Sequence, residues 1–413
     1  MGGGRMDRAA LKQLIADHVG EFSNDPVLAK HLILDHHMST SYLDGADPNG
    51  FWAIRKEVRN ELARAGIADT SVPREVCPGS KVLMEEMRAF LLKEKAPVPM
   101  TDLAIQLGAS VEEIVKVIEG MHEVGYNVIV SNRGVEIRNE IEPGSTSKID
   151  VTQFATKHHK FGVTGDNHLG SKYSRIDVLN ALFDIWQSEG VTKVYQCGNI
   201  IDGEFRFNLQ DLIARGIGGQ VDYLIENWPR REGIVTEFIT GDDHEGWYVQ
   251  REGINIGRLI QHEAEDAGRM DLKYIGHMEH TIELKCEHGS SLMRIVHAGG
   301  GSAYATSYTA QKLVESYQGG EKPHVLLIGH YHKFEYGYPR EVHSLQPGCT
   351  EDQSPFMRKK KIAAHVGGCT VEFDQDDHGV IHNFKVTWMP FYDRGFYAAG
   401  GEWKYQHNMK GQL

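Results

Sequence analysis

Residues 161–168 read FGVTGDNH, a short apolar run that ends in a glycine and is followed by acidic, amide and histidine side chains. Four later segments have the same texture: VYQCGNIID (194–202), EFITGDDHE (237–245), RIVHAGGG (294–301) and LLIGHYHK (326–333). Short apolar runs bounded by glycine are typical of buried β-strands. Because α/β proteins place their sites at the carboxyl ends of strands, the five segments predict one functional site assembled from strand ends.

Helical patterns separate the predicted strands. Residues 174–190 and 254–268 carry apolar side chains at helical spacing, and residues 304–317 predict a further helix before the last strand. Alternating apolar runs at 280–297 and 370–388 predict β-hairpins. Strands that alternate with helices indicate an α/β fold, and the hairpins indicate that its sheets are mixed.

The polar residues at two strand ends have a spacing that suits metal binding. Asp166 and His168 are two residues apart, as are His330 and His332, so each pair projects to one side of an extended chain. Carboxylate, imidazole and amide groups suit Mn²⁺, Fe or Zn²⁺, and the absence of paired cysteines argues against a cysteine-based structural zinc site. One H-x-H pair is weak evidence, but five such strand ends in one domain favour a metal site.

The order of these residues resembles the motif set of the calcineurin-like metallophosphoesterases: D-x-H, G-D-x-x-D, G-N-H-[DE], a later H, and G-H-x-H. The corresponding residues are Asp166-x-His168, Gly198-Asn199-Ile200-Ile201-Asp202, Asp243-His244-Glu245, His297 and Gly329-His330-x-His332. The resemblance covers about residues 161–333. Flanking segments such as GDNHLG and GCTEDQSPFMRKKK resemble a branch often encoded by bacteriophages and prophages.

The resemblance implies a sandwich of two mixed sheets flanked by helices, and two divalent ions that hold a hydroxide for in-line attack on a phosphoryl group. The implied ligands are Asp166, His168 and His332 for one ion, and Asp243, His297 and His330 for the other, with Asn199 bridging. The histidine-rich ligand set favours Mn²⁺, with Fe or Zn²⁺ as alternatives.

The resemblance also implies roles outside the ligand set. His244 would protonate the leaving oxygen or stabilise its charge. Asp202 would hydrogen-bond a ligand imidazole such as that of His168, and Glu245 would be a carboxylate that orients His244.

This chain departs from the family's pattern at two positions. Asn199 stands where the family has an acidic bridge, and Asp243 stands where the family has asparagine before the catalytic histidine. Together the two exchanges keep two carboxylates among the ligands. This compensation favours an active metal site over a decayed one and leaves the bridging position of Asn199 open.

The region before the predicted sheets divides into two parts. Residues 1–75 predict a helical region, with helices at 8–19, 26–35 and 50–65, and residues 76–141 predict a winged-helix-like module. Ser110 and Glu113 form a capping box at the start of the helix that ends at Glu123. That helix has four glutamates and one lysine, a net charge of −3, so we expect a protein-contact or dimerisation role rather than DNA binding. A linker at 142–147 precedes the catalytic domain, residues 150–413.

Composition limits the class of protein. The 413 residues suggest two or three domains, and no apolar run approaches the roughly 20 residues that span a bilayer. Five cysteines without a C-x-x-C pair fit a reducing cytoplasm, which would be that of a bacterial host if a phage encodes the chain. The net charge of −13 opposes a general nucleic-acid clamp. The basic run 358–361 either steers a substrate or forms a solvated face, and both interpretations stay open.

The sequence therefore predicts a metal-dependent phosphoesterase, a hydrolase that we expect to be a phosphodiesterase or nuclease acting on DNA or RNA. A phosphomonoesterase acting on a phosphoprotein or nucleotide is the alternative within the class. A non-catalytic scaffold is the alternative outside it, although the retained histidines and His244 count against a scaffold. The N-terminal modules suggest a homo-oligomer or a protein partner, and no membrane association is expected.

Overall fold

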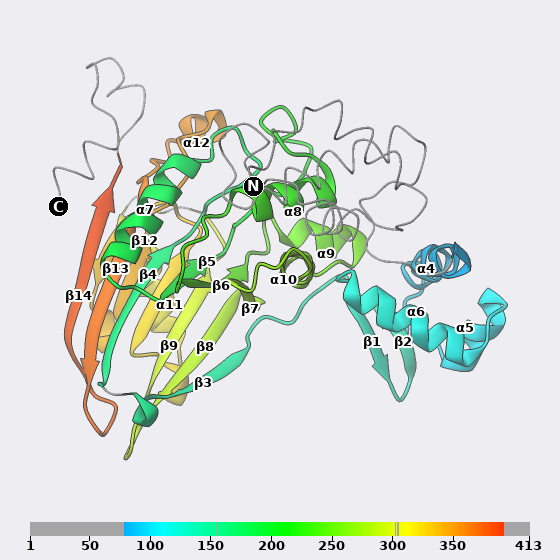
Figure 1. The fold of residues 1–413 in the computed structure, drawn as a ribbon, viewed down its shortest axis with the longest axis horizontal. Coiled ribbons are helices and arrows are strands. Elements are labelled where there is room, and N and C mark those ends of the chain that lie inside the picture. The colour runs from blue at the N-terminus through cyan, green and yellow to red at the C-terminus, as the bar shows by residue number, and fades with distance from the viewer. Residues whose placement is uncertain (1–77, 155, 302, 304, 392–413) are drawn as a thin grey trace, which may run out of the picture. The chain divides into compact units, whose positions relative to one another are not determined.

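A computed structural model of the chain describes residues 78–154, 156–301, 303 and 305–391 (Figure 1). The helices expected within residues 1–75 lie outside the described residues. The chain divides into two compact units, the first ending at Ile137 and the second starting at Arg138.

The described part of the first unit contains three helices and a hairpin. These elements are α4 (Pro78–Leu91), α5 (Met100–Leu107), α6 (Val111–Glu123), β1 (Val128–Ser131) and β2 (Gly134–Ile137). The predicted capping box at the start of α6 is confirmed, since the Glu113 N–H donates to the Ser110 hydroxyl and the Ser110 N–H donates to the Glu113 carboxylate. The helices enclose a small core of Met87, Leu103, Ile114 and Met121.

The second unit contains two six-stranded mixed sheets. The first has the order β11 (Phe334–Gly337), β12 (His343–Pro347), β10 (Val325–Gly329), β9 (Ser290–His297), β8 (Glu279–Lys285) and β3 (Thr146–Asp150). The second has the order β14 (Ile381–Pro390), β13 (Gly367–Gln375), β4 (His158–Thr164), β5 (Lys193–Cys197), β6 (Val235–Thr240) and β7 (Leu272–His277), and runs from left to right in Figure 1. Strands β4 to β7 are parallel, whereas β13 and β14 form an antiparallel hairpin.

The core lies between the two sheets. Side chains such as Val163 and Cys197 from one sheet pack with Ile295 and Leu327 from the other, and all four are fully buried. Strand β10 is buried along its whole length, which explains its continuous apolar sequence. At about 25 cal/mol per Å² of apolar surface removed from water, this layer supplies the main stabilisation of the unit.

Helices α7 (Ile176–Ser188) and α10 (Ile256–Asp266) pack against the second sheet, and α11 (Thr306–Ser316) packs against the first. The second unit also contains α8 (Gly216–Asn227) and α9 (Gly246–Glu252), which contact α10, and α12 (Pro355–Lys360). The fully buried Trp186 of α7 lies so close to β4 that a Cβ atom at Gly162 would stand 2.6 Å from its ring. On the other sheet, Val314 of α11 packs against Leu326 and Ile328 of β10.

The predicted fold class, an α/β arrangement of two mixed sheets flanked by helices, is confirmed by this architecture. The predicted helices at 174–190, 254–268 and 304–317 correspond to α7, α10 and α11, and the two predicted hairpins are present. The linker predicted at 142–147 is wrong at its end, because Thr146 and Ser147 pair with β8 as the start of β3. None of the helices in the described part of the chain has the length and apolarity that crossing a bilayer requires.

Candidate metal centre

The ends of the five predicted strands meet where the two sheets approach each other. The tight approach requires glycine at two positions: a Cβ atom at Gly198 would stand 2.3 Å from Nδ1 of His297, and one at Gly329 would stand 2.0 Å from the carbonyl oxygen of Cys197. The backbones of neighbouring strand ends are also joined, since the Asp166 N–H donates to the Gly198 carbonyl at 3.0 Å. Residues far apart in the sequence are thereby held in one cluster.

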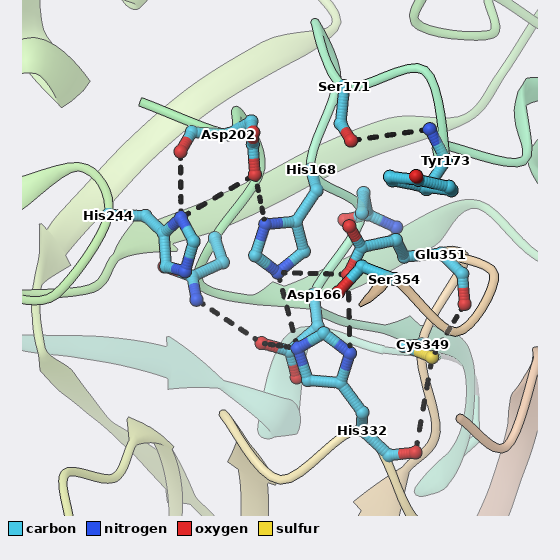
Figure 2. Close-up of polar contacts among 12 residues, drawn as sticks. Asp166, His168, Ser171, Tyr173, Asp202, His244, His332, Cys349, Glu351 and Ser354 are labelled. Carbon is cyan, nitrogen blue, oxygen red and sulfur yellow. Dashed lines mark hydrogen bonds and ion pairs between the residues drawn. The ribbon is translucent and has the colours of Figure 1, made fainter. Parts of the chain in front are cut away.

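Asp166, His168 and His332 form a first triad, with ligand atoms within 4.8 Å of one another (Figure 2). Nε2 of His168 lies 3.2 Å from Nε2 of His332, which in turn lies 3.6 Å from Oδ1 of Asp166. All three residues lie largely out of the solvent. The triad has the donor set and the proximity that one metal ion requires.

Carboxylates stand behind both imidazoles of the first triad. Nδ1 of His168 donates to Oδ1 of Asp202 at 2.9 Å, and Nδ1 of His332 lies 3.5 Å from Oε2 of Glu351. A proton on Nδ1 of His168 leaves its Nε2 lone pair facing Nε2 of His332, whose own Nδ1 is buried without a hydrogen-bond partner. Burial lowers the pKa of both rings, that of His332 to about 3, so a further proton between them is disfavoured. A metal ion fits this arrangement better than a proton does.

Asp243, His297 and His330 form a second triad, also with ligand atoms within 4.8 Å of one another. Oδ1 of Asp243 lies 3.4 Å from Nε2 of His297, and its Oδ2 lies 3.2 Å from Nδ1 of His330. Here the second nitrogen of each imidazole donates to a backbone carbonyl, at 2.7 Å in both cases: His297 to Cys197 and His330 to Gly300. The remaining nitrogens are therefore free to act as ligands.

The second triad attracts positive charge. Burial opposes protonation of His297, but the carboxylates of Asp243 and Asp166 outweigh it and raise the pKa of His297 to about 10. Burial also opposes protonation of His330, but the carboxylate of Asp243 outweighs it and raises the pKa of His330. A divalent cation would satisfy this demand with a charge that a single proton cannot supply.

Asn199 lies between the triads. Its Nδ2 is 3.4 Å from Oδ1 of Asp166, and its Oδ1 faces the second triad: a Cβ atom at Gly241 would stand 2.8 Å from that oxygen and 2.9 Å from Nε2 of His297. Both of these atoms are buried without a hydrogen-bond partner. Since buried polar atoms are rarely left unpaired, the unpaired Oδ1 of Asn199 and Nε2 of His297 near Gly241 fit a site that holds an ion.

Five of the candidate ligands have a backbone conformation that L-residues rarely adopt. Asp166, His168, Asn199, His330 and His332 have φ between 48° and 90°, and they make up five of the ten non-glycine residues with positive φ in the described part of the chain. Such conformations cost of order 1–3 kcal/mol each and persist where the surrounding structure enforces them. Their concentration here indicates that the surrounding structure enforces these conformations, at a cost in folding free energy, and so positions these side chains.

His244 lies beside the first triad and outside both ligand sets. Its Nδ1 donates to the carbonyl oxygen of Asp202 at 2.7 Å and lies 3.5 Å from the Asp202 carboxylate, as Figure 2 shows. Its ring packs edge-on against that of His168, with centroids 4.5 Å apart. The side chain is 24% exposed, so a substrate can reach the ring. His168, Asp202 and His244 also form a group close enough to hold an ion, which makes His244 an alternative ligand.

Glu245 has different contacts from those expected. It was predicted to orient His244, but its buried carboxylate accepts hydrogen bonds from the backbone N–H groups of Asn199, Ile200, Ile201 and Gly241 at 2.6–3.2 Å. Burial raises the pKa of Glu245 to about 7, against the effect of these bonds. Glu245 therefore connects the loop after β5 to the loop after β6 through hydrogen bonds. The residue that contacts and orients His244 is Asp202.

Sequence reasoning missed Glu351. Burial, and then the carboxylates of Asp202 and Asp166, raise its pKa well above the usual range. Glu351 and Asp202 thus lie beside the first triad and add two acidic side chains to that of Asp166, which favours a cation at this site. Glu351 lies in the flanking segment GCTEDQSPFMRKKK, but no ligand motif includes it, because it follows β12 and meets His332 only through the fold.

Two further features of the sequence, Cys197 and the basic run 358–361, lie outside the two triads. Cys197 is fully buried in β5, as predicted for a small apolar residue. Residues 358–361 are exposed at the end of α12, which leaves both interpretations of this basic run open.

No protein-family model matches the sequence, and no curated protein matches it. Among solved structures, the chain is similar to an archaeal phosphodiesterase (10% identity, 56% of this chain and 99% of that chain, TM-score 0.29). It is also similar to a predicted phosphoesterase from Streptococcus pneumoniae (18%, 57% and 91%, 0.28) and to Vps29 from Entamoeba histolytica in complex with Zn²⁺ (14%, 57% and 100%, 0.27). These identities and TM-scores are low, so the similarities support no conclusion about the activity of this chain.

Proposed function

We propose that this protein hydrolyses phosphoric esters with two divalent ions, and that phosphodiesters are its preferred substrates. The observation that carries the proposal is the convergence of two histidine–aspartate triads, with the unpaired oxygen of Asn199 facing the second. A protein that needed these residues only for stability would pair the buried Asn199 oxygen and the His297 nitrogen with each other or with the backbone.

In this proposal Asp166, His168 and His332 hold one ion, and Asp243, His297 and His330 hold the other, with Asn199 reaching both. When bound, the two ions would polarise the phosphoryl oxygens and lower the pKa of an attacking water. Four imidazoles among the ligands favour Mn²⁺ over Mg²⁺, with Fe and Zn²⁺ as alternatives.

His244 donates the proton to the leaving oxygen. Its Nδ1–H is held by the Asp202 carbonyl, which leaves Nε2 as the nitrogen that can carry a proton to the substrate. Asp202 supports both His168 and His244 and so couples the position of a ligand to that of the proton donor. Glu245 keeps the loops of Asn199 and Asp243 at a fixed separation.

The preference for diesters, and for DNA or RNA as their source, rests on the resemblance to phage-encoded enzymes. The net charge of −13 argues against nucleic acid as the substrate, because an acidic protein repels the phosphate backbone. A monoesterase acting on a phosphoprotein or nucleotide is the second candidate. A scaffold role is disfavoured because the histidines of both triads are retained together with an accessible His244.

For residues 76–141, we propose a winged-helix-like module that contacts protein rather than DNA. The exposed positions of α6 include Glu112, Glu113, Glu119 and Glu123, which would repel a phosphate backbone. Exposed Val111 and Val115 on the same helix offer apolar surface to a protein partner.

The proposal is tested by measuring metal content and turnover on the same purified sample. The substrates are a chromogenic aryl phosphodiester and its matching monoester, each with added Mn²⁺. We expect turnover of both, with a higher kcat/KM for the diester. A higher value for the monoester would select the second candidate. Two bound ions without turnover of either substrate would select the scaffold.

A further inference from the structure

An aromatic stack extends from the proton donor to the surface. Phe205 lies edge-on to the ring of His244, with centroids 5.2 Å apart and an interplanar angle of 75°. Its other neighbour is Trp247, which is nearly parallel to it, at 6.3 Å and 21°. Phe205 lies in the loop after Asp202, His244 lies in the loop after β6, and Trp247 lies in the first turn of α9, so the three rings form a continuous row beside the candidate centre.

The outer ring of this row is unusually accessible. Trp247 is 43% exposed, whereas Trp186 and Trp228 of the core are at most 2% exposed. Phe205 is half-buried, and Phe207 on the same loop is 77% exposed. Tryptophan and phenylalanine at the surface carry a cost in water, and aromatic rings exposed next to a reaction site are the usual means of binding a flat ligand.

The loop that carries Phe205 is held in place. Buried Asn208 donates to Oδ2 of Asp202 at 2.9 Å and to the carbonyl oxygen of Gly203 at 3.1 Å, and it accepts from the Phe205 N–H at 3.0 Å. Arg251 of α9 donates to the carbonyl oxygen of Glu204 at 3.4 Å. The rings are therefore positioned before a ligand arrives, and little ordering cost remains to be met on binding.

Building on the proposed function, we propose that Phe205 and Trp247 form a stacking site for the nucleobase of the leaving group. His244 serves the leaving oxygen, so the alcohol part of the substrate extends from His244 along the row of rings. Two nearly parallel rings present a flat face, which suits a planar base of any sequence. A duplex keeps its bases paired and stacked, so the site selects unpaired bases, whether in single-stranded nucleic acid or in a small nucleotide diester.

The first test compares two diesters that differ only at the leaving nucleoside: a dinucleotide, and the same molecule without the base on the leaving side. Base stacking is worth roughly a 5- to 150-fold change per base, so the abasic compound should have a kcat/KM lower by about that factor. Trp247→Ala should lose a similar factor on the dinucleotide and none on the abasic compound. Tyr338→Ala, which removes another exposed aromatic ring (56% exposed), is the matched control and should change neither. Equal effects of Trp247→Ala on both substrates would overturn the proposal.

The second test is independent of turnover. Binding of a non-hydrolysable dinucleotide analogue to the full chain should quench tryptophan fluorescence, and Trp247→Phe should remove that part of the quenching. If no diester is hydrolysed but this quenching occurs, the proposed function fails while the stacking site stands. If diesters are hydrolysed but neither the quenching nor the base preference is seen, the stacking site fails while the function stands.

A comparison of oligonucleotides separates the two sources of the base. Faster cleavage of single strands than of dinucleotides indicates nucleic acid, and the reverse indicates a small nucleotide diester. Both outcomes support a base-stacking site. Cleavage of a duplex at the rate of the single strand contradicts it, because paired bases cannot reach Trp247.

Discussion

Nδ1 of His330 lies 3.2 Å from Oδ2 of Asp243, although Nε2 of the same ring donates to the Gly300 carbonyl. A neutral imidazole has a single N–H, so Nδ1 attracts the carboxylate oxygen only when the ring is protonated or when a cation lies between the two atoms. Asp243 accordingly raises the pKa of His330, against the effect of burial, and a metal ion could take the place of that proton. Asp243 also faces His297 and is the only carboxylate of the second triad, as Asp166 is of the first.

Because Asp243 and Asn199 stand where the family has asparagine and an acidic residue, we expect substitutions at the two positions to be coupled. Asn199→Asp should tighten metal binding but lower turnover, because a third carboxylate makes the ions weaker Lewis acids. Asp243→Asn should abolish binding of the second ion. The double exchange restores two carboxylates in the family's usual places, so it should recover far more activity than the two single losses predict when added. Metal affinity and turnover are measured for all four proteins, and simple additivity in both would refute the placement of Asn199 between the ions.

Glu351 should act on one ion only. Glu351→Gln keeps the shape of the side chain but weakens the acceptor opposite Nδ1 of His332. Loss of such a supporting carboxylate typically costs about 10–100-fold in metal affinity. A stepwise metal titration should therefore show one weakened site and one unchanged site. The control is Glu321→Gln at an exposed glutamate. Equal weakening of both sites would mean that Glu351 supports the fold rather than His332.

Replacing His244 should separate chemistry from metal binding. His244→Ala removes the proton donor and none of the six triad residues, so we expect both ions to remain while turnover falls by about 10²–10⁴-fold. The loss should shrink on esters with a good leaving group, which need little help from an acid. Loss of an ion from this variant would show that His244 is itself a ligand, in the group that it forms with His168 and Asp202.

Most of the site could be predicted because its residues follow strands. Asp166, Asn199 and His330 each come after an apolar run and a glycine. The resemblance to the family's motifs implied two sets of three ligands, and the ligand atoms of each set lie within 4.8 Å of one another in the structure. Glu351 and the contacts of Glu245 could not be predicted, since both depend on loops that meet only in the folded chain. The pairing of β3 with β8 was missed for the same reason, because the two strands are distant in sequence.

The buried His277 should make the folded protein less stable in acid. It is 7% exposed at the end of β7, and its Nδ1 lies 3.0 Å from the hydroxyl of Thr240. Burial lowers its pKa to about 4, with Asp242 opposing and His297 adding to the shift. An unfolded histidine titrates near 6.5, so below that pH the unfolded chain binds a proton that the folded chain does not, and stability falls as the pH drops from about 6.5 to about 4.

The effect of His277 is measured by urea unfolding of the metal-free protein at pH 7.5 and pH 5. His277→Asn keeps a polar partner for Thr240 but removes the titration, so it should lose about 2 kcal/mol less than the parent protein between the two pH values. Equal losses in the two proteins would show that His277 is not held neutral by burial.

We propose that the two triads bind two ions and that turnover requires both. The most direct test is a Mn²⁺ titration of the exhaustively chelated chain. Bound metal is determined by elemental analysis, turnover is followed on the same samples, and the ions are located by anomalous diffraction. We predict two ions per chain, one at Asp166, His168 and His332 and one at Asp243, His297 and His330, with activity appearing as the second ion binds. Full turnover without detectable metal, or ions bound away from both triads, would contradict the account.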